Sequence, residues 1–240
     1  MSVLSTRLRN QLLVEPGQGT KARGRTPAEI VAWLGAVQAQ DYYGASWALG
    51  LRSAGLTAAD VDAAFDAGEI LRTHVLRPTW HFVTPDDIGW LLALTGPRVQ
   101  RSTRNAWPRL GIDDALVKRA RRVIERTLAT TDRGTCAVTR SELAAPLEKA
   151  RLLPAAGPRR SIALAHLLMH AELEGMICSG PRRGKQFTYA LLEERAPQAV
   201  PALRFAASSS KATASGPRST ARDEALARLA SRYFRSHGPA

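Results

Sequence analysis

Gln38 and Gln40, two glutamines separated by one small apolar residue, are the first candidates for chemistry in this chain. Apolar residues recur at helical spacing from Ile30 to Val37, which predicts that the pair lies at the C-terminal end of an amphipathic helix, before an aromatic turn over 41–44. Glutamine does not titrate, so neither residue can be a general base, but each amide offers one acceptor and two donors. Two such amides could hold a water molecule or bind the edge of a nucleic-acid base. The alternative is a solvated helix end, which the spacing alone favours.

The histidines allow a different kind of chemistry. His166 and His170 are four residues apart, so a helix would place both on one face, where they could bind a metal. No carboxylate pair or cysteine set accompanies them, and a position at the edge of the core is the favoured interpretation. His74 and His81 flank a predicted turn and could contact phosphate or simply be hydrogen-bonded within strands. The motifs of serine hydrolases, phosphate-binding loops and zinc proteases are absent from the sequence, and we expect neither metal nor cofactor.

The charge balance points to a polyanionic partner. The 240 residues include 34 Lys and Arg against 21 Asp and Glu, a formal net charge of +13, and arginine supplies nearly all of the positive side. Arginine suits bidentate contacts with phosphate, although a GC-rich genome would also enrich it. Cys136 and Cys178 are far apart, which is typical of buried thiols in a reducing compartment. No apolar run has membrane-spanning length, so we predict a cytoplasmic protein.

Local signals predict the elements that must position these residues in the first part of the chain. Residues 26–38 and 57–68 are predicted helices, because a threonine and an acidic residue three positions later form a capping box at the start of each. Residues 69–83 are rich in β-branched and aromatic residues, which predicts a β-hairpin with Pro78 at its turn. Another helix is expected over 85–96.

The same order of elements recurs further along the chain. A basic amphipathic helix is predicted over 116–128, a short helix over 139–149 and a longer helix over 159–174. Two strands follow, at 176–178 and 185–192, joined by a basic turn that contains glycine. Helices followed by a two-stranded wing are typical of a winged helix-turn-helix. We therefore predict an α+β fold, mainly α with small β wings, built from tandem winged-helix units.

The predicted domain boundaries follow from this repeat. The first winged-helix unit, with the glutamine pair, covers residues 1–110, and the second covers 111–200. Residues 201–221 are rich in Ala, Ser and Thr and are predicted to be a flexible linker. An amphipathic helix within 222–240 is interpreted as the beginning of an incomplete third unit.

The second wing tip is a candidate DNA contact. Arg182, Arg183 and Lys185 surround a glycine, and such a turn suits the phosphate ridge of a duplex. The alternative is a solvated turn. Arg72 and Arg77 in the first hairpin receive the same interpretation on weaker grounds.

Taken together, these stretches resemble the winged-helix DNA glycosylases related to the azinomycin-resistance enzyme. The similar stretches are Leu34–Arg52, Leu71–Leu94, His170–Arg195 and the tail 225–240. The catalytic signature of that family is glutamine, an aliphatic residue and glutamine, with aspartate as the last residue in a sister branch. Gln38, Ala39 and Gln40 match its glutamine form.

A second run of residues also resembles the family. Arg77–His81 is similar to its Arg-Gly-Thr-x-His run, which adds Thr79 and His81 to the candidate DNA contacts. Pro78 replaces the glycine of that run. Family members carry three winged helices and a C-terminal β-barrel, so the resemblance also implies that this chain is truncated as its third unit begins.

The resemblance implies a monofunctional DNA glycosylase, which hydrolyses the N-glycosidic bond to excise alkylated purines or unhook crosslinks, without a lysine Schiff base. Gln38 and Gln40 would position the water at the anomeric carbon. The expected partner is double-stranded DNA, damaged or crosslinked. We expect a monomer that associates with the nucleoid and with no membrane. A non-catalytic winged-helix regulator and an inactive remnant that binds nucleic acid loosely remain the alternatives.

Overall fold

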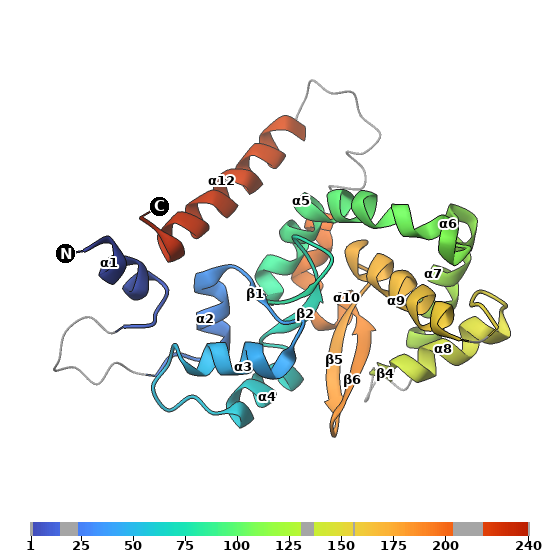
Figure 1. The fold of residues 1–240 in the computed structure, drawn as a ribbon, viewed down its shortest axis with the longest axis horizontal. Helices are drawn as coiled ribbons and strands as arrows, with labels where there is room; N and C mark the ends of the chain where they lie inside the picture. Colours follow the sequence, from blue (N-terminus) through green and yellow to red (C-terminus); the bar gives the residue numbers. More distant parts are fainter. Residues whose placement is uncertain (1, 15–23, 131–136, 156, 204–217, 240) are drawn as a thin grey trace.

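The computed structural model describes residues 2–14, 24–130, 137–155, 157–203 and 218–239, and Figure 1 shows the order of their elements. The first half contains α1 (Val3–Asn10), α2 (Pro27–Leu34), β1 (Val37–Gln38), α3 (Tyr42–Gly50), α4 (Ala58–Ala67), β2 (Leu71–His74), β3 (Trp80–Val83) and α5 (Pro85–Thr103). The second half contains η1 (Arg104–Ala106), α6 (Trp107–Leu110), α7 (Asp114–Ala129), β4 (Val138–Thr139), α8 (Arg140–Lys149), α9 (Pro158–Leu173), β5 (Ile177–Arg183), β6 (Gln186–Leu191), α10 (Leu192–Arg195), η2 (Pro197–Ala199) and α12 (Arg218–His237). The predicted α+β class, mainly helical with small antiparallel sheets, is confirmed.

The helix starts that local sequence predicts are present. The side chains of Thr26, Thr57 and Thr139 each accept a hydrogen bond from the backbone N–H three residues later, and the acidic side chain at that position accepts one from the backbone N–H of the threonine. These capping boxes satisfy donors that a helix leaves unpaired at its N-terminus. Gly68 ends α4 with φ 82°, a left-handed conformation that favours glycine.

The predicted end of the first helix is wrong. Gly35 has φ 83° and ends α2 at Leu34, so Val37 and Gln38 form a short strand instead of a last helical turn. The stretch predicted as an aromatic turn is in fact α3, whose N-terminus is capped by Asp41 through the backbone N–H of Tyr43. The apolar residues of 30–37 keep helical spacing across this boundary, although Leu34 belongs to α2 and Val37 to β1. The spacing alone therefore did not indicate where the helix ends.

Two other predicted boundaries are also wrong. The helix expected to end near Gly96 continues through Pro97 to Thr103. A proline inside a helix removes one backbone hydrogen bond and crowds the preceding turn, but the residues around Pro97 pack against α9: Val99 forms a buried cluster with Met169 and Leu173. The first strand of the second wing extends to Arg183, so the turn is only two residues long.

The two halves share one sheet topology. In the first, β3 lies between β1 and β2; in the second, β6 lies between β4 and β5, and all pairs are antiparallel. Each sheet therefore comprises a hairpin and a short strand that precedes two helices in the chain. This is the order of elements on which the interpretation as two winged-helix units depends.

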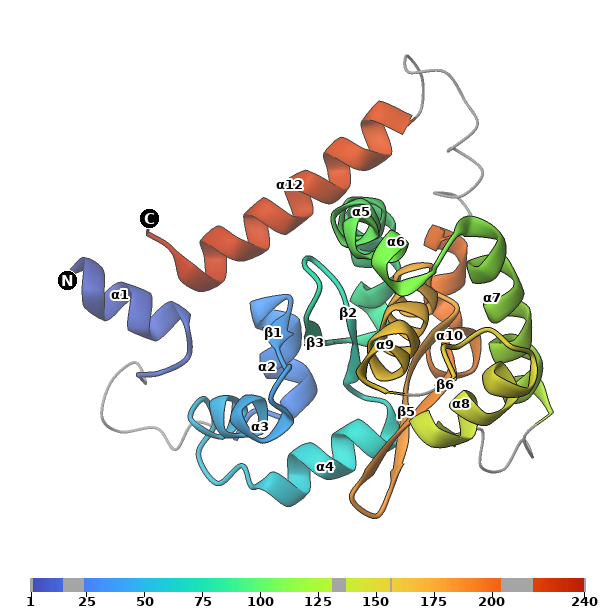
Figure 2. The same ribbon diagram turned by 45° about the vertical axis from the view of Figure 1, so that its right-hand side comes forward.

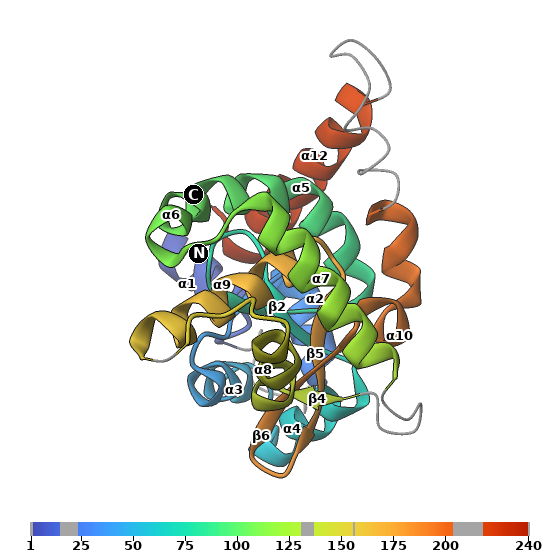
Figure 3. The same cartoon turned by 90° about the vertical axis from the view of Figure 1, so that its right-hand side faces the viewer.

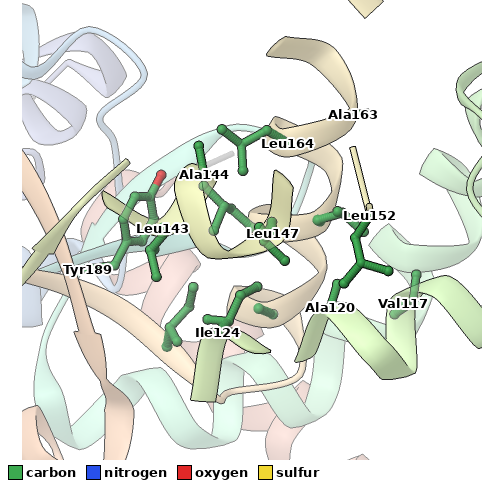
Figure 4. Close-up of a cluster of buried hydrophobic side chains, with 14 of the residues drawn as sticks. Val117, Ala120, Ile124, Leu143, Ala144, Leu147, Leu152, Ala163, Leu164 and Tyr189 are labelled. Carbon is green, nitrogen blue, oxygen red and sulfur yellow. The ribbon is translucent and has the colours of Figure 1, made fainter. Parts of the chain in front are cut away.

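Each half has its own buried core, and a third cluster joins them. Figure 4 shows the core of the second half, where side chains of α7, α8 and α9 meet Tyr189 of β6. The joining cluster combines β2, β3 and α5 with Cys178, Leu192 and Ala199. Burial raises the pKa of the Cys178 thiol to about 12, as expected of an unreactive buried cysteine. Cys136 lies outside the described residues.

The last helix, α12, packs along α5 and crosses near α2 and α1 (Figures 1 and 2). Its Arg228 and Arg232 bind the carboxylate of Asp87, which is 1% exposed, and both guanidinium groups lie over the Trp90 ring. In Figure 3, α12 and the β5–β6 hairpin tip lie at opposite ends of the molecule. The predicted linker falls largely on 204–217, outside the described residues, and no described helix is long and apolar enough to cross a membrane.

Candidate active site between the two halves

The glutamine pair lies on an extended segment and not on a helix. Gln38 pairs with His81 across the β1–β3 ladder, and the backbone N–H of Ala39 donates to the carbonyl of Trp80 at 2.8 Å. Because side chains alternate along an extended chain, Gln38 and Gln40 project to the exposed side while Ala39 is fully buried. The spacing of the two glutamines is therefore that of a strand, and it places both amides on one face.

Both glutamine carbonyls have a partner in the first hairpin. The Arg77 guanidinium donates to Gln38 Oε1, and the backbone N–H of Trp80 donates to Gln40 Oε1 at 3.2 Å. Both partners are donors only, so each amide must turn its oxygen toward the hairpin. Among the described residues the two NH₂ groups and the second lone pair of each oxygen have no further partner, so they can bind a ligand or a water molecule.

Arg72 holds the backbone of the glutamine segment from beneath. Its Nε donates to the carbonyl of Ala39 at 2.9 Å, and its terminal nitrogen donates to the carbonyl of Gln40 at 3.2 Å. The guanidinium carbon lies 4.3 Å from the centre of the Trp80 ring and 4.9 Å from that of Phe187. Burial lowers the pKa of Arg72, although the nearby Glu172 carboxylate opposes that shift.

Two adjoining hollows lie beside this segment, between the two halves of the chain. The first has a volume of about 370 Å³ and is lined by Gln40, His74, Trp80, Arg140, His166 and Tyr189 among others. The second, of about 650 Å³, is lined by Arg72, Lys185 and Phe187 and shares Trp80, Arg140 and Tyr189 with the first. We call the two together the inter-unit groove. Three of its cations, Arg72, Arg140 and Lys185, come from both halves, so the groove is electropositive.

A buried carboxylate lies behind the wall of the first hollow. Glu172, on α9, is 1% exposed and is within hydrogen-bond contact of His74 Nδ1, while Trp80 Nε1 donates to its other oxygen at 3.2 Å. The rings of His74 and Trp80 lie 4.6 Å apart, centre to centre. The contacts join the first hairpin to α9, so a residue of the second half helps to orient two residues of the groove.

The candidate DNA contacts occupy very different environments. Arg182 is bound by Asp62 and Asp66 of α4, and Arg183 by Glu142 at the start of α8, so both cations already have carboxylate partners. Lys185 is exposed at the turn and lines the second hollow. Two of the three predicted DNA-contacting cations therefore also join the wing tip to neighbouring helices.

The first-hairpin candidates divide in the same way. Arg77 is exposed and holds Gln38, whereas Arg72 is buried beneath the glutamine segment. His81 is buried and bonded to the carbonyl of Thr79 at 2.9 Å; burial lowers its pKa to about 4, so the ring is neutral at pH 7. The Thr79 hydroxyl is buried and has no hydrogen-bond partner among the described residues.

The two histidines of α9 are also separated by their surroundings. His166 lines the first hollow, while His170 packs its ring 5.5 Å from that of Trp107 and lies beside Glu174. Within the described part of the chain, no group of three or more His, Cys, Asp or Glu side chains could hold a metal ion.

Sequence reasoning missed Trp80, Arg140, Tyr189 and Glu172 as parts of the site. Their elements were predicted, but nothing in the local sequence brings residues about 90 positions apart together, as in the contact of Glu172 with Trp80. Only Trp80 could have been suspected from the sequence, because it lies within the Arg77–His81 run that resembles the glycosylase family.

The model of a protein family described as DNA glycosylase AlkZ-like matches residues 31–240, most of the chain. The chain belongs to the AlkZ-like DNA glycosylase family. Among solved structures, it is similar to Streptomyces sahachiroi DNA glycosylase AlkZ, with 21% sequence identity and a TM-score of 0.71. That likeness covers 99% of this chain and 57% of the Streptomyces chain, and at this identity it supports the fold. No curated protein sequence matched.

Proposed function

We propose that this chain hydrolyses the N-glycosidic bond of alkylated purines in double-stranded DNA, as a monofunctional glycosylase that also acts on crosslinked bases. The observation that carries the proposal is the position of Gln40 on the wall of an electropositive groove, with Gln38 on the same face of the same extended segment. Family membership supports it. The chain spans 57% of the length of the Streptomyces enzyme, and the activity is proposed for this chain on its own.

The chemistry suits groups that do not titrate. Alkylation at N7 or N3 gives a purine a positive charge, so the base can leave without first being protonated. The protein then needs to position a water molecule and stabilise the sugar cation that forms, which is a matter of geometry and electrostatics. Each glutamine oxygen keeps a second lone pair beside its hairpin contact, and that lone pair can accept a hydrogen of the water.

The groove also suits an extruded base. A glycosylase must take its target nucleotide out of the stack, and the first hollow, about 370 Å³, is in the range of small-molecule sites. Trp80 is one of the residues that line it. We infer that Lys185, Arg140 and Arg77, which lie in or beside the groove, contact the phosphate backbone. In this proposal the two halves are winged-helix units that hold the duplex between them.

The test is release of free 7-methylguanine from a methylated duplex, followed by chromatography. Wild type should release the base, and Gln38→Ala and Gln40→Ala should reduce the rate toward that of the uncatalysed reaction. Gln198→Ala is the matched control, because Gln198 is an exposed glutamine that is bonded to Asp86 and does not line the groove. Equal release by wild type and both groove variants would refute the proposal. Protection of discrete sequences in a footprint, without base release, would instead support a DNA-binding regulator.

A further inference from the structure

The proposed reaction, on which this inference rests, produces a proton that the glutamine pair cannot take. Water adds through its oxygen to C1′, the bond from C1′ to the purine nitrogen breaks, and the electron pair of that bond neutralises the alkylated purine. One proton of the water must then leave the new hydroxyl group. A primary amide has no basic site near neutral pH, so Gln38 and Gln40 can orient the water but cannot accept its proton.

One titratable side chain of the groove has the arrangement of an oriented base. His74 lines the first hollow beside Gln40, and its Nδ1 contacts the carboxylate of Glu172. The carboxylate accepts a hydrogen bond there, so the proton of the neutral ring is held on Nδ1 and Nε2 is the free base. Nε2 bonds to none of the described residues and is not among their buried, unpaired polar atoms, so it is open to the hollow.

Glu172 itself is not placed to accept the proton. It is 1% exposed and does not line the hollow, and its two oxygens face His74 Nδ1 and Trp80 Nε1. Its position instead suits a group that fixes the tautomer of His74 and stabilises the imidazolium once it forms. Trp80 adds to this orientation, because its indole both binds Glu172 and lies 4.6 Å from the His74 ring.

The other polar groups of the first hollow are poorer acceptors. The Arg140 guanidinium offers hydrogen-bond donors and no acceptor. Burial raises the pKa of Tyr189 above its ordinary value, so the phenol stays protonated. His166 has no carboxylate contact, and its Nδ1 lacks a hydrogen-bond partner among the described residues; burial and the nearby His74 lower its pKa.

We propose that His74, oriented by Glu172, is the general base that takes the proton from the attacking water, while Gln38 and Gln40 orient that water. The proton passes from the water oxygen to His74 Nε2 as the carbon–oxygen bond forms. The imidazolium is then held by the Glu172 carboxylate until it releases its proton to solvent. His74 is thus a catalytic residue, and Glu172 is a positioning residue that acts through it.

The test compares single-turnover release of 7-methylguanine at saturating protein. His74→Gln keeps an N–H donor for Glu172 but cannot accept a proton, and should slow release about 100-fold or more at unchanged duplex affinity. Glu172→Gln should also slow release strongly. Its oxygen must accept from Trp80 Nε1, so its NH₂ group faces His74 Nδ1 and forces the ring proton onto Nε2. His170→Gln is the matched control, since His170 is a buried histidine of α9 outside the groove.

Imidazole rescue separates a catalytic role from a structural one. Imidazole added to His74→Ala should restore part of the rate, because the shortened side chain leaves room in the hollow for the free base. A His74→Gln variant that works at the wild-type rate, or a slow His74→Ala variant that imidazole does not rescue, would overturn the proposal. A larger loss in His166→Gln than in His74→Gln would also overturn it. If wild type releases no base, or Gln40→Ala is as fast as wild type, the proposed function itself falls.

Discussion

Replacing Arg72 with leucine is expected to destabilise the chain and to slow base release together, because one guanidinium holds the backbone of the glutamine segment. Arg72 donates to the carbonyls of Ala39 and Gln40 and lies between two aromatic rings. A leucine fills part of that space but donates nothing. Ala39 is fully buried, so its carbonyl then loses its hydrogen-bond partner and has no water to replace it. Gln40 is exposed, so its carbonyl can bond to water instead.

The magnitude follows from these contacts. A hydrogen bond from a charged donor contributes about 1.5–3 kcal/mol, and an unsatisfied buried carbonyl costs about 1–3 kcal/mol. Because the Gln40 carbonyl regains water, we expect a loss of roughly 2–4 kcal/mol in the free energy of unfolding. Release of 7-methylguanine should fall about 10–100-fold, since displacing a positioning group by about 1 Å is enough for such a loss.

The assay is urea unfolding in parallel with single-turnover base release, and Arg195→Leu is its matched control. Arg195 also donates from a partly buried guanidinium to two backbone carbonyls, those of Phe65 and Asp66, but at the end of α4. The control should lose comparable stability and keep its rate of base release once folded. An Arg72→Leu variant that differs from wild type by less than about 0.5 kcal/mol, or that slows release no more than Arg195→Leu, would refute the reasoning.

Three further predictions concern stability. Burial holds the pKa of His81 at about 4, against 6.5 in the unfolded chain, so the unfolded state takes up a proton first as the pH falls. The free energy of unfolding should therefore decline between about pH 6.5 and pH 4, by up to roughly 3 kcal/mol. Urea unfolding across that range should show a much flatter pH dependence in His81→Asn, and an equal slope in both proteins would contradict this prediction. A Cβ at Gly89 would lie 2.6 Å from the carbonyl oxygen of Ala199, so Gly89→Ala should cost about 1–3 kcal/mol, whereas Gly50→Ala, with 3.6 Å to its nearest neighbour, should cost little; thermal unfolding of the two variants decides. Arg232→Ala should destabilise the chain more than Arg228→Ala, because Arg232 is the more buried partner of Asp87, with 20% exposure against 45%; the reverse order in urea unfolding would show that the two contacts are not ranked by burial.

The helix starts were predictable because their causes are local. The capping boxes at Thr26, Thr57 and Thr139 each need only residues within three positions, and all three are present in the structure. The prediction that the helix continues to Gln38 was wrong for a local reason too, since Gly35 ends α2 while the apolar spacing continues into β1. Helix α5 was underestimated for a nonlocal reason: packing of Val99 against α9 outweighs the hydrogen bond that Pro97 removes.

The two glutamines of the site could be predicted from the sequence, whereas most of the residues around them could not. Gln38 and Gln40 stand out from spacing and from a family resemblance, but what surrounds them comes from both halves of the chain. Glu172 reaches Trp80 from 92 positions away, and Arg182 of the wing binds Asp66 from 116 positions away. The wing cations were predicted as DNA contacts from a basic turn that contains glycine, and the fold adds carboxylate partners for two of them, which the local sequence does not reveal.

We propose that two amides on one extended segment, at the edge of an electropositive groove, carry the hydrolysis. The most direct test is the single-turnover rate of 7-methylguanine release by wild type and by the double variant Gln38→Ala/Gln40→Ala, measured at equal occupancy of the methylated duplex. We expect wild type to release the base and the rate of the double variant to fall to that of duplex without protein. Equal release by the two proteins would contradict the proposal.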